Sequence, residues 1–102
     1  MHESLELTRF TVHPGAEAAF LSGRDAAMRA LSKRFPGLLD ATLVRLSSGE
    51  YLDSVRWASH DEAQHAMEGA MALPEVAAWF IHISEVHSME HASVLHVLRE
   101  VR

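Results

Sequence analysis

The chain has 102 residues, of which 48% are hydrophobic and 23% are charged, and it contains no cysteine. This length allows one hydrophobic core and predicts a single domain over residues 1–102. Nine Lys and Arg against fourteen Asp and Glu give a formal net charge of -5, which argues against a nucleic-acid partner, while the missing cysteines exclude disulfides and thiolate metal sites.

The first half of the chain predicts a strand, a helix and a strand hairpin. Residues 5–12 are β-branched and apolar and end at a Pro-Gly turn, which is typical of a strand. Over residues 16–34 the apolar side chains recur at helical spacing. Residues 38–46 and 51–58 are two strand-like runs joined by a short polar segment with a Gly, so we expect antiparallel neighbours.

The second half predicts a broken helix and a long strand. Ser59 and Glu62 form the pattern of a capping box, so a helix is expected to begin there. Pro74 interrupts this helix, and the apolar stripe resumes over residues 75–83. Residues 85–101 are strand-like but long, and this strand is expected to bend or to reach past the domain.

The order β-α-β-β-α-β predicts an α+β, ferredoxin-like fold, with a four-stranded antiparallel sheet covered on one face by two helices. The predicted strands carry apolar residues on both faces, whereas a sheet with one solvated face would alternate more cleanly. The uncovered face is therefore expected to pack against a second copy of the chain as a homodimer. No apolar run spans a membrane and residues 1–6 lack a signal-peptide pattern, so we expect a cytoplasmic protein without a membrane partner.

Four segments in this order resemble one known family, and together they cover nearly the whole chain. They are RFTVHPG (residues 9–15), AEAAFLSG (16–23), RWASHDEA (56–63) and LPEVAAWF (73–80). The chain resembles the antibiotic biosynthesis monooxygenase-like proteins, which are dimeric α+β barrels. The resemblance implies a homodimer with a hydrophobic cleft between sheet and helices in each subunit.

The resemblance implies several activities, and a shared fold does not choose among them. We expect a cofactor-independent monooxygenase that acts on an aromatic or quinone-like small molecule, with no cofactor and no metal. A non-catalytic dimeric ligand-binding or stress-response module is the alternative. Haem degradation is a lesser one, because Thr8 and Ala66 stand where the haem-degrading branch carries Asn and Trp. Ala66 also stands where many members of the family have a His, which leaves the catalytic base open.

Apolar side chains expected on the helix-facing side of the sheet and on the second helix are candidates for binding a flat substrate, since aromatic walls suit an aromatic ligand. The alternative is that these side chains are only core anchors. The predicted substrate-binding residues are Phe10, Trp57, Met67, Met71, Trp79 and Phe80.

His82 and Arg56 are the predicted catalytic residues. His82 follows Trp79 by three positions at the edge of the apolar stripe, where a base would reach a substrate lying on the indole. Arg56 adjoins Trp57 and could stabilise a phenolate, although adjacent strand residues face opposite ways. The alternatives are an ordinary rim histidine and an arginine paired with Asp40 or Asp53.

The other histidines are interpreted as polar surface groups. His65 is expected to face solvent, paired with Glu68 three residues further along the helix. His87, Met89 and His91 alternate along the predicted last strand and are expected to project from one face. Their spacing within one strand is too wide for two imidazoles to share one ion, and a metal site shared across a dimer is the alternative.

Overall fold

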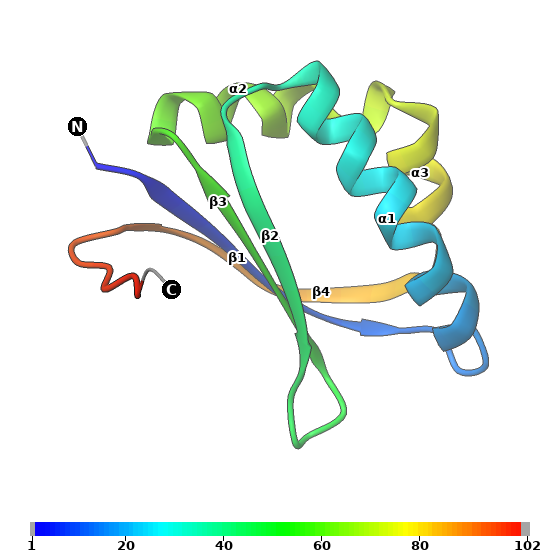
Figure 1. Cartoon of the computed structure of the whole chain (residues 1–102). Coiled ribbons are helices and arrows are strands. Elements are labelled where there is room, and N and C mark those ends of the chain that lie inside the picture. The colour runs from blue at the N-terminus through cyan, green and yellow to red at the C-terminus, as the bar shows by residue number, and fades with distance from the viewer. Residues whose placement is uncertain (1, 101–102) are drawn as a thin grey trace.

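The computed structural model describes residues 2–100, and the sheet and helices of the domain lie within them (Figure 1). The first half contains β1 (Ser4–Val12), α1 (Glu17–Arg34), β2 (Leu38–Arg45) and β3 (Tyr51–Trp57). The second half contains α2 (His60–Gly69), the short 3-10 helix η1 (Ala70–Ala72), α3 (Pro74–Phe80) and β4 (Ile83–Ser93). The predicted order of elements is confirmed, with the second helix divided into three pieces.

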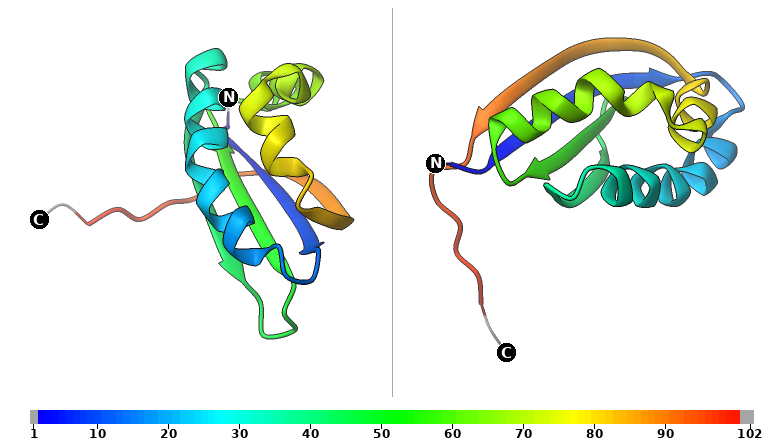
Figure 2. Two further views of the ribbon diagram at one scale, coloured as in Figure 1. Left: turned by 90° about the vertical axis from the view of Figure 1, so that its right-hand side faces the viewer. Right: turned by 90° about the horizontal axis from the view of Figure 1, so that it is seen from above.

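The four strands form one antiparallel sheet in the order β2-β3-β1-β4, so the first strand is central and pairs with both the third and the fourth. All the helices lie on one face of this sheet (Figures 1 and 2). This is the predicted ferredoxin-like α+β fold. None of the helices in the described part of the chain is long and apolar enough to cross a membrane.

Two local signals set the limits of the second helical region. The hydroxyl of Ser59 accepts a hydrogen bond from the backbone N–H of Glu62 at 3.2 Å, which satisfies a donor at the start of α2. Pro74 has no N–H and cannot continue a helix, but it is tolerated in a first turn. The chain therefore passes through the 3-10 turn η1 and starts again as α3 at Pro74.

The core lies between the sheet and the helices and is built around aromatic side chains. Along β3 every second residue is buried, which is the pattern of a strand with one face against the core. Phe20 on α1 is fully buried and stacks on Trp79 of α3, with ring centroids 5.2 Å apart. The indole N–H of Trp79 donates to the backbone carbonyl of Phe20 at 3.1 Å, so this ring joins the two helices.

The prediction for the last strand was wrong at its carboxyl end. The strand was expected to run to residue 101, but it ends at Ser93, which pairs with Ser4 at the start of β1. Beyond that pair the N–H of Val94 still donates to the carbonyl of Glu3 at 2.8 Å, and no strand follows up to residue 100. Residues 94–100 run away from the body of the domain (Figure 2), and residue 101 lies outside the described part.

The face of the sheet opposite the helices has no cover within the described part of the chain (Figures 1 and 2). Leu5 and Leu7 of β1 and Leu52 of β3 lie on this face and are only half-buried. The extended segment that follows the strand adds the exposed side chains of Leu95 and Leu98. The domain thus presents apolar surface on its uncovered side.

Candidate functional site

A cavity of about 170 Å³ lies between the helix-facing side of the sheet and the helices. Its floor is formed by β1, β3 and β4, and its roof by α1, α2, η1 and α3. All six residues predicted to bind substrate line it. The lining residues are Glu6, Thr8, Phe10, Met28, Leu31, Asp53, Val55, Trp57, Ala66, Met67, Ala70, Met71, Val76, Trp79, Phe80, Ile83 and Met89.

The period of the strands explains which polar residues join this apolar wall. Side chains two positions apart on a strand share a face, so Glu6 and Thr8 of β1 project to the same side as the buried Phe10. Asp53 on β3 is likewise on the side of Val55 and Trp57. The cavity is therefore mostly apolar, with two carboxyl groups and one hydroxyl on its floor.

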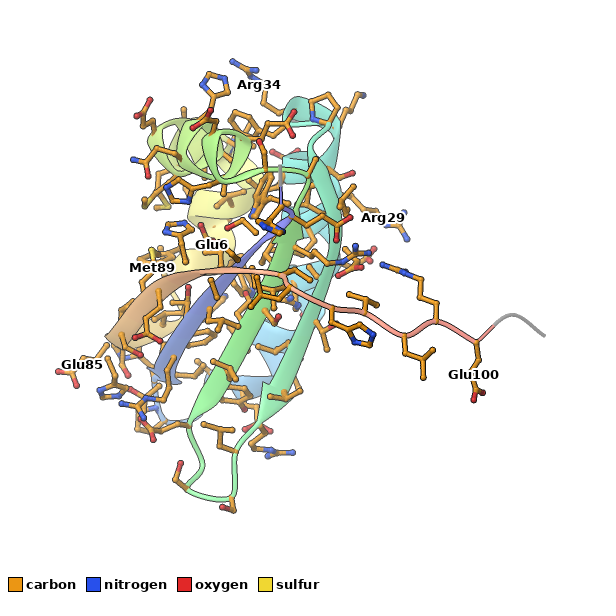
Figure 3. All side chains as sticks on the ribbon, turned by 90° about the vertical axis from the view of Figure 1, so that its left-hand side faces the viewer. Glu6, Arg29, Arg34, Glu85, Met89 and Glu100 are labelled. Carbon is orange, nitrogen blue, oxygen red and sulfur yellow. The ribbon has the colours of Figure 1, made fainter. Side chains whose placement is uncertain are left out.

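Glu6 and His91 form a polar pair at the sheet side of the cavity. They are direct cross-strand partners on β1 and β4, and Nε2 of His91 lies 3.4 Å from Oε2 of Glu6. The side chains of Glu6 and His91 are only 17% and 18% exposed. Burial raises the pKa of the Glu6 carboxyl above its ordinary value; the nearby His91 opposes this rise and Asp53 adds to it. Figure 3 shows Glu6 and Met89 on the side of the sheet that faces the helices.

Two buried polar atoms, both on residues of the helix-facing side of the sheet, have no hydrogen-bond partner within residues 2–100. One is Nε2 of His91, which is close to Glu6 but not aligned with it as a hydrogen bond. The other is the indole Nε1 of Trp57, whose ring is only 2% exposed. Trp57 is two residues from Val55, the partner of Glu6 on β3, and so lies on the same face as Glu6. Unpaired buried polar atoms are uncommon and often mark binding or catalytic positions.

Asp53 is held in a buried ion pair. Its two carboxylate oxygens accept hydrogen bonds from the guanidinium of Arg24 on α1 at 2.7 and 2.8 Å. Arg24 also lies over the ring of Trp79, 5.7 Å from the centroid. This pair neutralises the second carboxylate of the cavity and ties α1 to the sheet.

The two predicted catalytic residues, His82 and Arg56, do not line the cavity. His82 is in the turn after α3, where its N–H donates to the carbonyl of Trp79 at 3.2 Å and its own carbonyl accepts from the N–H of His13. Arg56 is on the uncovered face of the sheet and binds the carboxylates of Asp40 and Glu3. The hydrogen bonds that Arg56 donates to Asp40 and Glu3 raise the pKa of Arg56, so it stays charged.

Two expectations about the remaining histidines were wrong. His65 is exposed, as expected, but it packs edge-on against Phe35 with ring centroids 5.6 Å apart, and no ion pair joins it to Glu68 within the described residues. A register shift between β1 and β4 leaves His87 without a partner on β1. His87 contacts Glu85 at 3.1 Å, whereas His91 contacts Glu6, so these two imidazoles do not share an environment.

The part of the chain that the structure describes has no group of three or more His, Asp or Glu side chains arranged to hold a metal ion. The side chains at the cavity and its sheet side offer several chemical groups. They are an acid or base at Glu6, an imidazole at His91, a free donor at Trp57 and flat apolar walls.

The fold and site define a small ferredoxin-like α+β protein with a cavity between sheet and helices. No protein-family model matches the sequence, and no curated protein matches it. Among solved structures the chain is similar to SnoaB, a cofactor-independent oxygenase from Streptomyces nogalater. The identity is 27%, with 97% of each chain covered and a TM-score of 0.67.

Two further solved structures share the fold. A putative antibiotic biosynthesis monooxygenase from Bordetella bronchiseptica is 24% identical over 96% of this chain and 100% of that one, with a TM-score of 0.71. One from Caulobacter crescentus is 18% identical over 93% and 92%, also with a TM-score of 0.71. The chain thus shares its fold with antibiotic biosynthesis monooxygenase structures, which supports the resemblance seen in its sequence motifs.

Glu6 was not predicted as a site residue, His91 was interpreted only as a polar surface group, and Asp53 only as a partner for an arginine. A signal for Glu6 was present, because alternation along residues 5–12 places it on the face of Phe10. His91 needed the register of two strands 85 positions apart in the chain, Glu6 with His91, which the sequence does not contain.

Proposed function

We propose that this protein binds a flat aromatic or quinone-like small molecule in the cavity and oxidises it with dioxygen without a bound cofactor. The observation that carries the proposal is an apolar, aromatic-walled cavity lined by Trp57, whose buried indole N–H has no hydrogen-bond partner within residues 2–100. The identity of 27% to a cofactor-independent oxygenase over nearly the full length supports the same reaction class.

The reaction class makes clear demands on the site. A substrate such as an anthrone has an acidic C–H, and its carbanion is electron-rich enough to react with dioxygen directly. One oxygen atom then becomes the product carbonyl, and the other leaves as water with the two hydrogens of the methylene group. The protein has to accept a proton, stabilise the resulting oxyanion and exclude bulk water.

In this proposal the walls orient the substrate and Trp57 donates its N–H to the developing negative charge. Aromatic rings and thioethers pack well against flat ring systems. The buried N–H of Trp57 has no competing partner within residues 2–100, so it is free to donate to a ligand. Donors of this kind contribute most where water is absent.

Oxygen uptake with anthrone and with hydroquinones tests the proposal. Trp57→Phe keeps the apolar ring and removes the donor, so we expect kcat to fall about 100-fold with a much smaller change in KM. Glu68→Gln, an exposed change on α2 away from the cavity, is the control and should retain wild-type uptake. Failure of the wild-type protein to consume oxygen with either substrate class would exclude the oxygenase.

The size of the cavity favours a second candidate, a non-catalytic ligand-binding module. Its volume of about 170 Å³ is below the several hundred Å³ usual for ligand sites. In the oxygenase, the flexible side chains of Met67 and Met71 have to move aside to admit a tricyclic substrate. Binding of anthraquinone that quenches the fluorescence of Trp57 and Trp79, together with no oxygen uptake, would identify the module.

We also propose that residues 1–102 act as one domain of a homodimer in the cytoplasm. The half-buried leucines of the uncovered sheet face, Leu5, Leu7 and Leu52, support a second copy as the missing cover. The projecting residues 94–100, with Leu95 and Leu98 exposed, support an exchange of this segment between subunits. Light scattering of the purified protein at micromolar concentration tests the assembly.

A further inference from the structure

We infer that Glu6 is the group that takes the proton from the substrate, and that His91 and His60 position it. This inference rests on the proposed function, because it assigns a residue to the reaction at the same cavity. It differs from the assignment of His82 that the sequence suggested.

Glu6 lies where a base could reach a bound substrate. Glu6 lines the cavity, whereas His82 does not, and its side chain is mostly buried. Its carboxyl lies between His91 on β4 and the face of β3 that carries Trp57. A proton acceptor and an oxyanion donor therefore line the same cavity from one face of the sheet, as removal of a proton next to a carbonyl requires.

Two histidines hold the side chain of Glu6 in place. Nε2 of His91 is 3.4 Å from its Oε2, and the ring of His91 meets the ring of His60 edge-on, with centroids 5.0 Å apart. His60 is the first residue of α2, so it braces the imidazole from the helix layer. Nε2 of His91 has no hydrogen-bond partner within residues 2–100 that would draw it away from Glu6.

The titratable and charged groups around Glu6 also bear on its role as the base. Glu6 faces His91 on β4 and Asp53 on β3, His60 of α2 stands behind His91, and Arg24 of α1 is bound to Asp53. Burial raises the pKa of Glu6, which makes its carboxylate a stronger base than an exposed one. The chemical step is the transfer of one proton. The substrate C–H bond breaks, an O–H bond forms on Glu6, and the electron pair stays on the substrate as an enolate.

Hydrogen exchange without dioxygen tests this role separately from the oxygenase. Anthrone is incubated with the protein in D2O under nitrogen, and loss of the methylene proton signal is followed by NMR. We expect the wild-type protein to accelerate exchange and Glu6→Gln to reduce the acceleration about 100-fold or more. Anthraquinone binding, followed by tryptophan fluorescence, should stay within about twofold of wild type because Gln keeps the shape of Glu.

His91→Gln tests positioning through the pH profile. Because His91 lowers the pKa of Glu6, its removal should move the acidic limb of the exchange profile to higher pH, which a purely structural role would not do. The control is Glu68→Gln, which removes an exposed carboxylate from α2 and should keep the wild-type profile.

Several results would overturn the inference. They are unchanged exchange in Glu6→Gln, loss of exchange in His82→Ala with Glu6→Gln unaffected, and no acceleration by the wild-type protein. Exchange that depends on Glu6 in a protein that consumes no oxygen would support the inference and exclude the oxygenase, so the two proposals fail separately.

Discussion

Arg24 and Asp53 form an ion pair that is only 13% and 9% exposed, while Arg29 and Asp25 on the same helix form one that is 79% and 76% exposed. The two pairs have the same N···O distance of 2.7 Å, so they differ chiefly in burial. Removing one partner of a buried pair leaves an uncompensated charge in the interior, whereas an exposed charge is solvated by water.

Arg24→Met should therefore destabilise the protein by about 3–5 kcal/mol in urea unfolding, because Asp53 loses its counter-charge. Arg29→Met, the matched exposed change on α1, should leave the unfolding midpoint where it is. Equal effects of the two substitutions would show that burial does not set the contribution of the Arg24 pair.

Glu6 links stability to pH with a definite sign. Its pKa is raised above 4.5 in the folded protein, so the native state holds the proton more tightly than the unfolded chain. Its favourable contribution is present below pH 4.5 and is lost as the pH rises through the folded value, where the buried carboxylate becomes charged. Glu6→Gln should accordingly be more stable than wild type at pH 8, and the difference should shrink toward pH 4.

Thermal unfolding of both proteins across this pH range measures the effect. A Glu6→Gln protein that is less stable than wild type at pH 8 would contradict it. The expected result also strengthens the exchange experiment, because a variant that folds better but exchanges less has lost chemistry and not structure.

At the scale of elements, the start of α2 depends on one hydroxyl. Ser59 is buried at the N-cap and accepts the N–H of Glu62, so Ser59→Ala should cost about 1 kcal/mol. Ser32→Ala, at an exposed position near the end of α1, is the control and should cost nothing, because alanine is the better helix former. If denaturant unfolding gave the same midpoint shift for both variants, the hydroxyl of Ser59 would not stabilise the start of α2.

The same scale shows what the sequence could and could not predict. The start of α2 could be predicted from the sequence because a helix cap is local. The hydroxyl and the N–H that donates to it are three residues apart. The end of β4 could not be predicted from the sequence. Val94 to Leu98 have strand-like side chains, but a strand ends where its hydrogen-bonded neighbour ends. That neighbour is β1, which begins at Ser4, about ninety positions earlier in the chain.

The candidate site likewise has a part that the sequence predicts and a part that it does not. Its apolar walls were predictable, since Met67, Met71 and Trp79 follow the period of their helices. The pair of Glu6 and His91 was not, because it depends on strand register, and the bulge at His87 shows that register along β4 is not uniform.

For the whole molecule, the proposed homodimer predicts an asymmetry between the two sides of the domain. Leu7→Lys places a charge in the uncovered sheet face and should turn the dimer into a monomer in size-exclusion chromatography with light scattering. Leu21→Lys, an exposed leucine of α1 on the helix side, should leave the mass unchanged. A monomeric wild-type protein would refute the proposal.

The wall of the cavity contains Met28, Met67, Met71 and Met89, which are four of the five methionines of the chain. Thioethers convert to sulfoxides when they meet peroxide or related species. A site that activates dioxygen beside them would damage itself whenever a reactive intermediate escaped. Mass spectrometry after prolonged turnover should then find added oxygen on these four side chains earlier than on Met1. The extent of their oxidation would therefore report how many turnovers the protein has completed.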